Sequence, residues 1–166
     1  MRPLLIAMVG APGSGKSTTA LAVAAAQEPR AMVLSLDQTR AQVSPFHDPC
    51  DQNVTPTAVA RLHAELSAYL RRGRSVVVDG AHTTCDARLA LLAIAAIRRA
   101  LTVAVVMTPP LAELQRRNAT RSTTVGRCGF ASWVPDAYLA ECHAHVAAAL
   151  PLLPAEGWDA VVVRPA

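Results

Sequence analysis

The chain reads LLIAMV at residues 4–9, GAPGSGKS at residues 10–17 and TTALAVAAAQ at residues 18–27. The first run is short and unbroken, which predicts a strand buried on both faces, as in a parallel sheet. The alanine-rich segment predicts a helix from Lys16 to Gln27. Between them, glycines allow successive N–H groups to turn inward, and the helix adds its positive end. A strand, a glycine-rich turn and a helix in this order predict a phosphate-binding loop.

The residues of this loop have complementary roles in holding a nucleoside triphosphate. We expect Lys16 to reach the β- and γ-phosphates and the Ser17 hydroxyl to hold Mg²⁺. Lys16 is the only lysine, whereas the other fifteen basic residues are arginines. A compact ammonium on a flexible stem suits this position. The residues expected to bind ATP, or another nucleoside triphosphate, are Gly10, Gly13, Ser14, Gly15, Lys16, Ser17 and Thr18. Triphosphate binding alone does not identify a reaction.

Length and composition favour one domain over residues 1–166. The chain has 166 residues, of which 52% are apolar, enough for one buried core. No apolar run approaches the roughly 20 residues of a membrane helix. Residues 1–9 resemble a secretory signal, but cleaving them would remove the strand that the loop requires. The four cysteines match neither a metal site nor a disulfide framework. We expect a cytoplasmic protein with reduced thiols and no membrane partner.

Strands and helices are predicted to alternate along the whole chain. Apolar runs predict further strands at residues 31–36, 75–78, 101–107 and 160–163. Further helices are expected at residues 55–72, 83–97, 111–120 and 135–150, the second of these opening with a capping box formed by Thr83 and Asp86. Polar, proline-rich or glycine-rich loops are expected at residues 44–56 and 122–132. This alternation predicts an α/β fold of three layers, with a five-stranded parallel sheet covered on both faces.

Two aspartates are expected where predicted strands end. Ligands of open parallel sheets collect beyond the carboxyl ends of the strands, so Asp37 and Asp79 should face the loop of residues 10–17. Asp37 could accept the proton of an attacking hydroxyl, or it could cap a helix at residues 38–40. The following Arg40 favours the first role, with a phosphate-bearing acceptor. Asp79 could hold a magnesium-bound water, orient an arginine, or cap the next turn.

Two groups of arginines invite both structural and functional interpretations. Arg117 and Arg121 are four apart on a predicted helix, so they could converge on a transferring phosphoryl group from one short lid. The alternative is a solvated basic face. Arg71, Arg72 and Arg74 lie at a predicted helix end, where cations complement the helix dipole. Contact with nucleic acid is the weaker alternative for this second group.

Several motifs together resemble the kinase domain of phage and bacterial 5′-polynucleotide kinases. They are Gly10 to Thr18, Asp37-Gln38-Thr39-Arg40, Val78-Asp79, Arg117-Asn118-Ala119-Thr120-Arg121 and Val134-Pro135. They occur in this order over most of the chain. The second and fourth are the informative ones, because the phosphate loop is shared by many kinases.

The resemblance implies a P-loop kinase fold with a short helical lid and specific roles for five side chains. Asp37 would be the general base for a 5′-hydroxyl, and Arg40 would hold the phosphate next to the acceptor nucleotide. Arg117 and Arg121 would cover the transferring phosphate, and Asp79 would help to organise the acceptor site. The implied partners are nucleic acid ends with a free 5′-hydroxyl, in DNA or RNA repair, with ATP and Mg²⁺ as cofactors.

The chain also departs from this family in two respects. It is too short for an added phosphatase or ligase domain, and it has no D-x-D acid pair for phosphatase chemistry. Residues 121–132 are richer in glycine than expected of a lid. Two alternatives therefore stay open, namely a kinase of a small hydroxyl substrate or of a modified base in DNA, and a nucleotide-binding switch without an acceptor.

Overall fold

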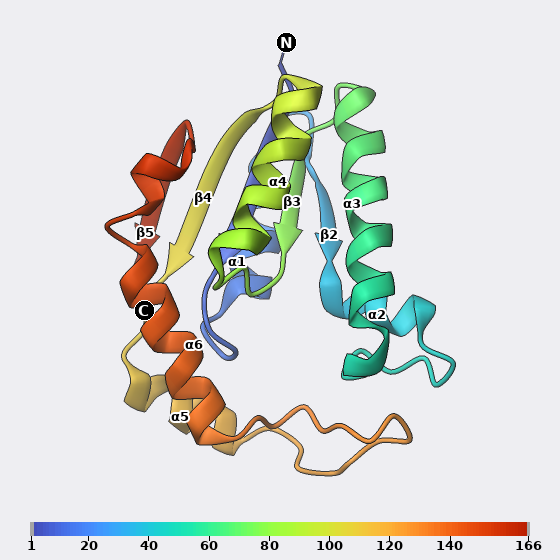
Figure 1. Ribbon diagram of the computed structural model, residues 1–166, viewed down its shortest axis with the longest axis vertical. Coiled ribbons are helices and arrows are strands. Elements are labelled where there is room, and N and C mark those ends of the chain that lie inside the picture. The colour runs from blue at the N-terminus through green and yellow to red at the C-terminus, as the bar shows by residue number, and fades with distance from the viewer. Residues whose placement is uncertain (1, 166) are drawn as a thin grey trace.

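The computed structural model describes residues 2–165 and shows one parallel sheet between layers of helices (Figure 1). The strand order is β2-β3-β1-β4-β5. The strands are β1 (Leu4–Val9), β2 (Met32–Ser35), β3 (Val76–Asp79), β4 (Leu101–Met107) and β5 (Ala160–Arg164). The α/β fold with five parallel strands is therefore confirmed, and β1 and β4 begin and end where the sequence predicts.

Six α-helices and two short 3₁₀ turns connect the strands of the sheet. The helices are α1 (Lys16–Ala25), α2 (Leu36–Val43), α3 (Thr55–Arg71), α4 (Cys85–Arg98), α5 (Leu111–Ala119) and α6 (Asp136–Ala149). The 3₁₀ turns are η1 (Gln52–Val54) and η2 (Leu153–Glu156). No helix within residues 2–165 combines the length and the apolar character needed to cross a bilayer.

The helices cover the two faces of the sheet unequally. Helix α1 packs on one face, where Ala20 and Ala24 meet Ile6 and Met8 of the central strand. Helices α3 and α4 cover the other face, with Leu66 among their buried side chains (Figure 1). All the carboxyl ends of the parallel strands lie at one edge of the sheet. This edge carries the loops in which the candidate site must be sought.

The end of β2 differs from the sequence prediction. The strand stops at Ser35, and α2 begins at Leu36, so Asp37 lies in the first helical turn. The Ser35 side chain accepts a hydrogen bond from the backbone N–H of Gln38. The backbone carbonyl of Ser35 accepts one from the Thr39 hydroxyl at 2.8 Å. Ser35 is therefore the helix cap, and the alternative of Asp37 as the cap is wrong.

The predicted end of α5 and the predicted capping box also need correction. Helix α5 ends at Ala119 because the Thr120 hydroxyl donates to the Arg117 carbonyl at 2.8 Å and so competes with the next backbone bond. Arg121 consequently lies beyond the helix. At α4 the cap residue is Thr84, with no side-chain capping hydrogen bond. The box expected from Thr83 and Asp86 does not form.

Candidate functional site

The loop between β1 and α1 has the backbone of a phosphate-binding loop. Gly15 adopts a φ of 88°, a left-handed conformation that glycine tolerates without steric cost. A Cβ on Gly10 would lie 2.6 Å from the Ser14 Oγ, so the loop closes only around a residue without a side chain. The Lys16 ammonium donates to the Ala11 carbonyl at 2.7 Å. Lys16 thus lies folded over the loop it is expected to serve.

The electrostatic surroundings of Lys16 identify its neighbours in the cleft. Burial lowers the pKa of Lys16 from 10.5 to about 8, whereas the nearby charges of Asp79 and Asp37 oppose that shift. Arg121 is close enough to lower the pKa further. The lysine, both aspartates and one lid arginine therefore share one electrostatic environment, as the sequence predicts.

Asp79 and Ser17 form an oxygen-rich corner beside this lysine. Burial raises the pKa of Asp79, while a hydrogen bond from the Ser17 hydroxyl and the Lys16 charge oppose the rise. Mg²⁺ takes oxygen ligands, commonly one or two from the protein and the rest from phosphates and water. Residues 2–165 contain no group of three or more His, Cys, Asp or Glu side chains that could hold a metal. The Ser17 and Asp79 oxygens fit an ion that relies mainly on phosphate and water.

The turn after Asp79 is tied to the base of the phosphate loop. The Ala81 carbonyl accepts from the Gly10 N–H at 2.9 Å, and His82 Nδ1 lies 2.8 Å from the Met8 carbonyl. Burial lowers the pKa of His82 to about 4, so the ring is neutral near pH 7. Because a carbonyl can only accept, Nδ1 must carry the proton. Sequence analysis did not predict this role of His82, because 74 positions separate it from Met8.

A buried ion pair supports the same turn from behind. The Arg88 guanidinium donates to the carbonyls of His82 at 3.0 Å and Thr83 at 2.9 Å. Its other nitrogens bind Glu156, which also accepts from the Trp158 indole at 3.2 Å. The Arg88 and Glu156 side chains are 2% and 8% exposed, so this is a desolvated pair. Sequence reasoning missed both residues, since 68 positions separate them and no local pattern joins them.

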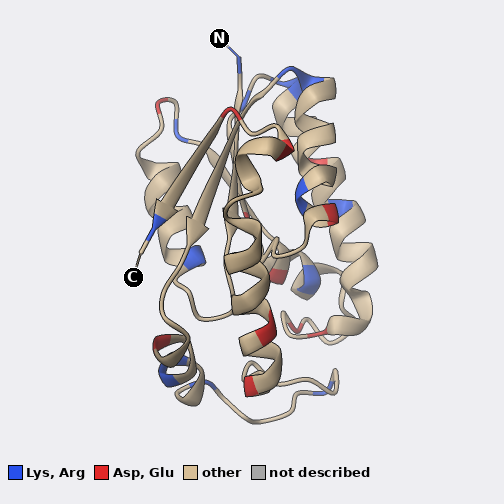
Figure 2. Cartoon of the chain, turned by 60° about the vertical axis from the view of Figure 1, so that its left-hand side comes forward, with Lys and Arg blue, Asp and Glu red and all other residues tan. Residues whose placement is uncertain are grey.

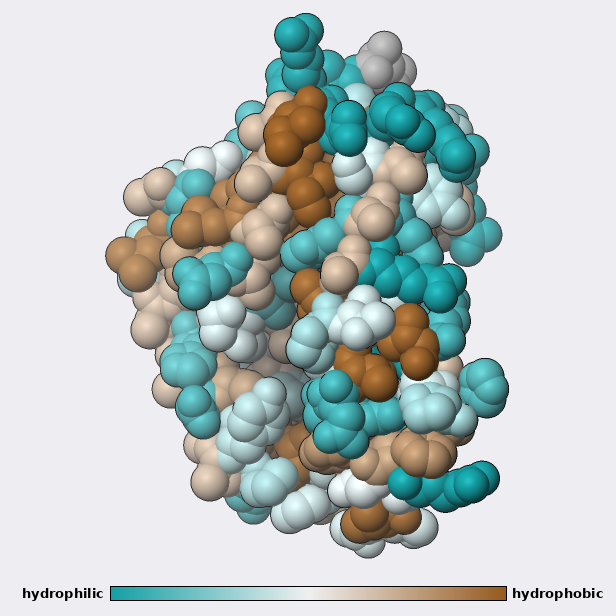
Figure 3. Space-filling model, turned by 45° about the vertical axis from the view of Figure 1, so that its right-hand side comes forward, coloured by the Kyte–Doolittle hydropathy of each residue, from teal (hydrophilic) through white to brown (hydrophobic). Residues whose placement is uncertain are grey.

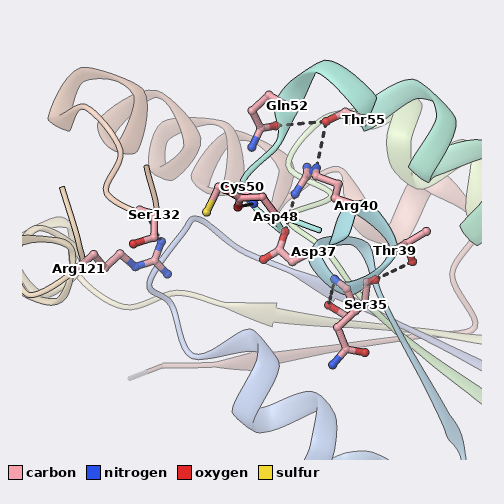
Figure 4. A network of polar contacts seen from close by, with 11 residues as sticks. Ser35, Asp37, Thr39, Arg40, Asp48, Cys50, Gln52, Thr55, Arg121 and Ser132 are labelled. Atoms are coloured by element: carbon pink, nitrogen blue, oxygen red, sulfur yellow. Dashed lines mark hydrogen bonds and ion pairs between the residues drawn. The ribbon is translucent and has the colours of Figure 1, made fainter. Parts of the chain in front are cut away.

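Asp37 and Arg40, from α2, line the cleft and contact one another (Figure 4). Arg40 Nη1 lies 2.5 Å from Asp37 Oδ1, and Arg40 Nε donates to the Thr55 hydroxyl at 3.0 Å. The Asp37 side chain is 70% exposed, whereas that of Arg40 is only 12% exposed. The carboxylate is therefore open to a substrate, while the arginine behind it fixes its orientation.

The two lid arginines reach the cleft from different structures. Arg117, on α5, donates to Glu113 at 2.6 Å and to the Gly13 carbonyl at 3.1 Å. Arg121, beyond the helix, donates to the Ser132 carbonyl at 3.2 Å. Convergence from one helical face is therefore wrong, although both residues line the cleft. Figure 4 shows Arg121 and Asp37 pointing toward the same space from opposite sides.

The segment of residues 120–135, the lid loop, meets the segment of residues 44–54, the acceptor loop. The Cys128 thiol donates to the Asp48 carboxylate at 3.1 Å, and the Asn53 amide lies 3.4 Å from the Cys128 carbonyl. The Arg127 guanidinium lies 5.6 Å from the centre of the Phe46 ring. These contacts form an arch over the cleft, which a sequence prediction of two separate loops did not contain.

Beneath the arch lies a cleft of about 1440 Å³. Its walls include phosphate-loop, acceptor and lid residues, among them Gly13, Gly15, Lys16, Ser17, Thr18, Asp37, Arg40, Asp79, Arg117 and Arg121. Ser14 is buried inside the loop, and Gly10 lies at its base. The structure thus brings the predicted site residues into one region of the molecule.

Comparisons with known proteins agree with this architecture. The family model AAA_33, described as an AAA domain, matches residues 5–149. No curated protein matches the chain. Among solved structures, a chain of the Pnkp1/Rnl/Hen1 RNA repair complex is 21% identical, with a TM-score of 0.71 over 90% of this chain. The match spans 45% of that longer chain, so this chain covers less than half of its length.

Two kinases with other substrates are also similar. The APS kinase CysC of Mycobacterium tuberculosis, in complex with AMPPNP and APS, has a TM-score of 0.57 and 21% identity, covering 72% of this chain and 70% of its own. A sugar kinase from a Janibacter species has a TM-score of 0.61 and 16% identity, covering 99% and 86%. At these identities the likeness concerns the fold. The chain belongs to the AAA domain family AAA_33 and has a P-loop kinase-like fold.

Proposed function

We propose that this protein transfers the γ-phosphate of ATP, or of another nucleoside triphosphate, to the 5′-hydroxyl of a polynucleotide. The observation that carries the proposal is the exposed Asp37 carboxylate, which Arg40 holds at the mouth of the cleft that contains Lys16. An exposed carboxylate opposite a phosphate loop is suited to take a proton from an attacking hydroxyl.

The reaction would proceed by direct displacement at the γ-phosphorus. The acceptor oxygen bonds to phosphorus as its proton passes to Asp37, and the bond to the oxygen bridging the β- and γ-phosphates breaks. Lys16 and the lid arginines Arg117 and Arg121 would offset the charge on the equatorial oxygens. Ser17, with Asp79 beside it, would hold Mg²⁺, which would supply further positive charge to the transferring group.

Arg40 is the residue that favours a polynucleotide acceptor. Its Nη2 has no hydrogen-bond partner among residues 2–165, whereas Nε and Nη1 bind Thr55 and Asp37. A phosphate adjoining the acceptor nucleotide would give this remaining donor group a charge-assisted partner. The similarity to a chain of an RNA repair complex supports the same substrate class.

A kinase of a small hydroxyl substrate, or of a modified base in DNA, is the second candidate. It is favoured by the strong engagement of Arg40, which is only 12% exposed and could serve solely to orient Asp37. The similarity to a sugar kinase points the same way. A nucleotide-binding switch is a third candidate, and the phosphate loop is the one feature that supports it.

Transfer of radiolabelled γ-phosphate tests these candidates directly. The acceptors are DNA and RNA oligonucleotides with 5′-hydroxyl ends, matched oligonucleotides with 5′-phosphates, nucleosides and sugars. We expect strong label on the 5′-hydroxyl oligonucleotides, weaker label on nucleosides, and none on sugars or on the oligonucleotides with 5′-phosphates. Labelled nucleosides or sugars without labelled oligonucleotides would end the polynucleotide assignment, and ATP hydrolysis indifferent to every acceptor would favour the switch.

Arg40→Ala separates the first two candidates. If Arg40 binds an acceptor phosphate, the KM for nucleoside 3′-phosphates should rise by about tenfold or more, because charge-assisted hydrogen bonds contribute about 1.5–3 kcal/mol. The KM for a nucleoside without a phosphate should then change little. If Arg40 only orients Asp37, both acceptors should lose kcat to the same extent, which would remove the phosphate-binding role.

A further inference from the structure

A row of arginines crosses the edge of the sheet opposite the cleft. Each of the strands β1 to β4 is preceded, two residues before its start, by an arginine. In the spatial order β2-β3-β1-β4 these are Arg30, Arg74, Arg2 and Arg99. Neighbouring strands lie about 4.8 Å apart, so the row extends for about 14 Å. The row is invisible in the sequence, because it emerges only when the sheet orders the strands.

The ends of two helices enlarge this row into a basic pole. Arg71 and Arg72 close α3, and Arg98 lies at the end of α4. Among residues 2–165, none of the seven arginines of the pole forms an ion pair with a carboxylate. Six of them are exposed, and Arg98 donates to the Ser67 hydroxyl. Figure 2 shows basic residues gathered at the end that carries the N-terminus, where Figure 3 shows strongly hydrophilic side chains.

The basic pole accounts for the whole net charge of the protein. The loops that lead into the strands at this edge hold two acidic residues, Glu28 and Asp159. Together with the seven arginines of the pole they give a net charge of +5. The chain has sixteen basic and twelve acidic residues, so the rest of the chain holds nine basic and ten acidic residues. Asp159 is moreover bound to Thr102 through both the backbone N–H and the hydroxyl. The rest of the chain is therefore close to neutral, and the surplus positive charge lies at the pole.

Helix dipoles explain only part of this surplus. The carboxyl ends of α1, α3 and α4 lie at this edge, and each contributes about half a negative charge. Three helix ends would balance about 1.5 of the positive charges. More than three positive charges remain, and the row of Arg30, Arg74, Arg2 and Arg99 follows strand starts. A purely structural role therefore leaves most of the charge unexplained.

We propose that the basic pole binds the sugar–phosphate backbone of a nucleic acid at a distance from the reacting end, an inference that rests on the proposed function. Arginines bind phosphates through two parallel hydrogen bonds, and unpaired exposed ones can do so without breaking an ion pair. The seven residues of β4 separate the pole from the cleft by about 20 Å, the rise of about six base pairs. Acceptors longer than this can contact both regions.

Binding of labelled oligonucleotides without ATP tests the pole independently of catalysis. The variant replaces Arg30, Arg71, Arg74 and Arg99 by Gln together, and leaves Arg2 because its guanidinium donates to the Arg99 carbonyl. The control variant replaces the exposed Arg61 and Arg164 by Gln. Fluorescence anisotropy compares DNA and RNA of about 5 and about 25 nucleotides at several salt concentrations. Thermal melting confirms that each variant is folded.

We expect the four-arginine variant to bind the long oligonucleotides at least about tenfold more weakly at low salt, with a log–log salt slope shallower by about 3. The control variant should lose far less, and the loss should be smaller for the short oligonucleotides, because they are too short to contact the pole and the cleft together. Equal affinity and slope for wild type and variant would overturn the proposal. So would a variant that binds the oligonucleotides as the wild type does but loses binding to vesicles of anionic phospholipid, measured in parallel. Phosphate transfer to the short acceptor, measured separately, distinguishes failure of the proposed binding at the pole from failure of the proposed kinase function.

Discussion

The donor half and the acceptor half of the cleft are built in different ways. The donor half is a single backbone loop, residues 10–17, in which glycine conformations and N–H groups provide the binding surface. The acceptor half consists of side chains from α2, the acceptor loop and the lid loop, joined by contacts such as that between Arg40 and Thr55. A backbone site is set once the chain folds, whereas a side-chain site depends on every contact behind it. Substitutions should therefore act differently in the two halves.

The largest expected effect separates the halves cleanly. Asp37→Asn removes the proposed proton acceptor while keeping the shape of the side chain, so phosphate transfer should fall by about 10²–10⁴-fold. Affinity for ATP, measured by calorimetry, should stay within about twofold, because the donor half is untouched. Lys16→Ala provides the contrast, since it should lose both ATP binding and transfer. Wild-type activity in Asp37→Asn would remove it as the base.

The next effect concerns Arg117, which links the lid to the donor half. Arg117→Ala should lower kcat by about 10²–10³-fold, the usual effect of removing one donor to a transition-state oxygen. Its neighbour Arg116 is a matched control, since both bind Glu113 but only Arg117 reaches the Gly13 carbonyl. Arg116→Ala should retain nearly full activity. Equal losses in the two variants would mean that Glu113 and α5, rather than the guanidinium, account for the effect.

A smaller effect tests the turn after Asp79, where His82 contacts the Met8 carbonyl. The pKa of His82 is lowered to about 4 in the folded protein. Between its ordinary value and pH 4, the unfolded chain binds more protons at this position than the folded protein does. The free energy of unfolding should therefore fall as the pH drops through this window, by up to about 3 kcal/mol.

His82→Asn removes this titration, and asparagine also tolerates the positive φ of 43° at this position. Urea unfolding between pH 7 and pH 4 should show a weaker loss of stability for the variant than for wild type. His145→Asn, which alters an exposed histidine of α6, is the control. Parallel stability curves for wild type and His82→Asn would show that the ring is not buried in its neutral form.

The smallest effect reverses the usual direction of a mutation in the donor half. Burial lowers the pKa of Lys16 to about 8, so the charged form destabilises the nucleotide-free protein at pH 7. Lys16→Met should raise its stability by about 1 kcal/mol, which corresponds to about 2–4 °C in Tm. The gain should shrink as the pH rises from about 8 to 10.5. Thermal melting with and without ATP should show protection of the wild type alone.

The same contrast explains how much the sequence could predict. The strands at residues 4–9 and 101–107 and the phosphate loop depend on local patterns, and their bounds were predicted correctly. The end of β2 was misjudged because the apolar run at residues 31–36 does not show that the Ser35 side chain caps α2. Arg121 was placed on a helix because the side chain of Thr120 was not expected to end it. Each error involved one side-chain hydrogen bond that outweighed a regular pattern.

Other parts of the site had no local pattern at all. The pair of Arg88 and Glu156, the bond from His82 to Met8 and the meeting of Asp48 with Cys128 all join residues more than sixty positions apart. Such contacts depend on the packing of α4, η2 and the two loops, which alternating strands and helices do not specify. The sequence could therefore predict which residues line the cleft, but not what holds them in place.

The arch over the cleft has a consequence for how a polymer could enter. Among the described residues it is closed by a thiol–carboxylate contact, a long amide hydrogen bond and one cation–π contact, and the short 3₁₀ turn η1 is the one regular element where its loops meet. Exposed loops joined by so few contacts separate readily. A strand therefore need not thread its tip through a closed ring. Under the proposed function, a nucleic-acid strand can enter from the side between the separated loops. Its length and the folding of its far end then need not limit access to the cleft.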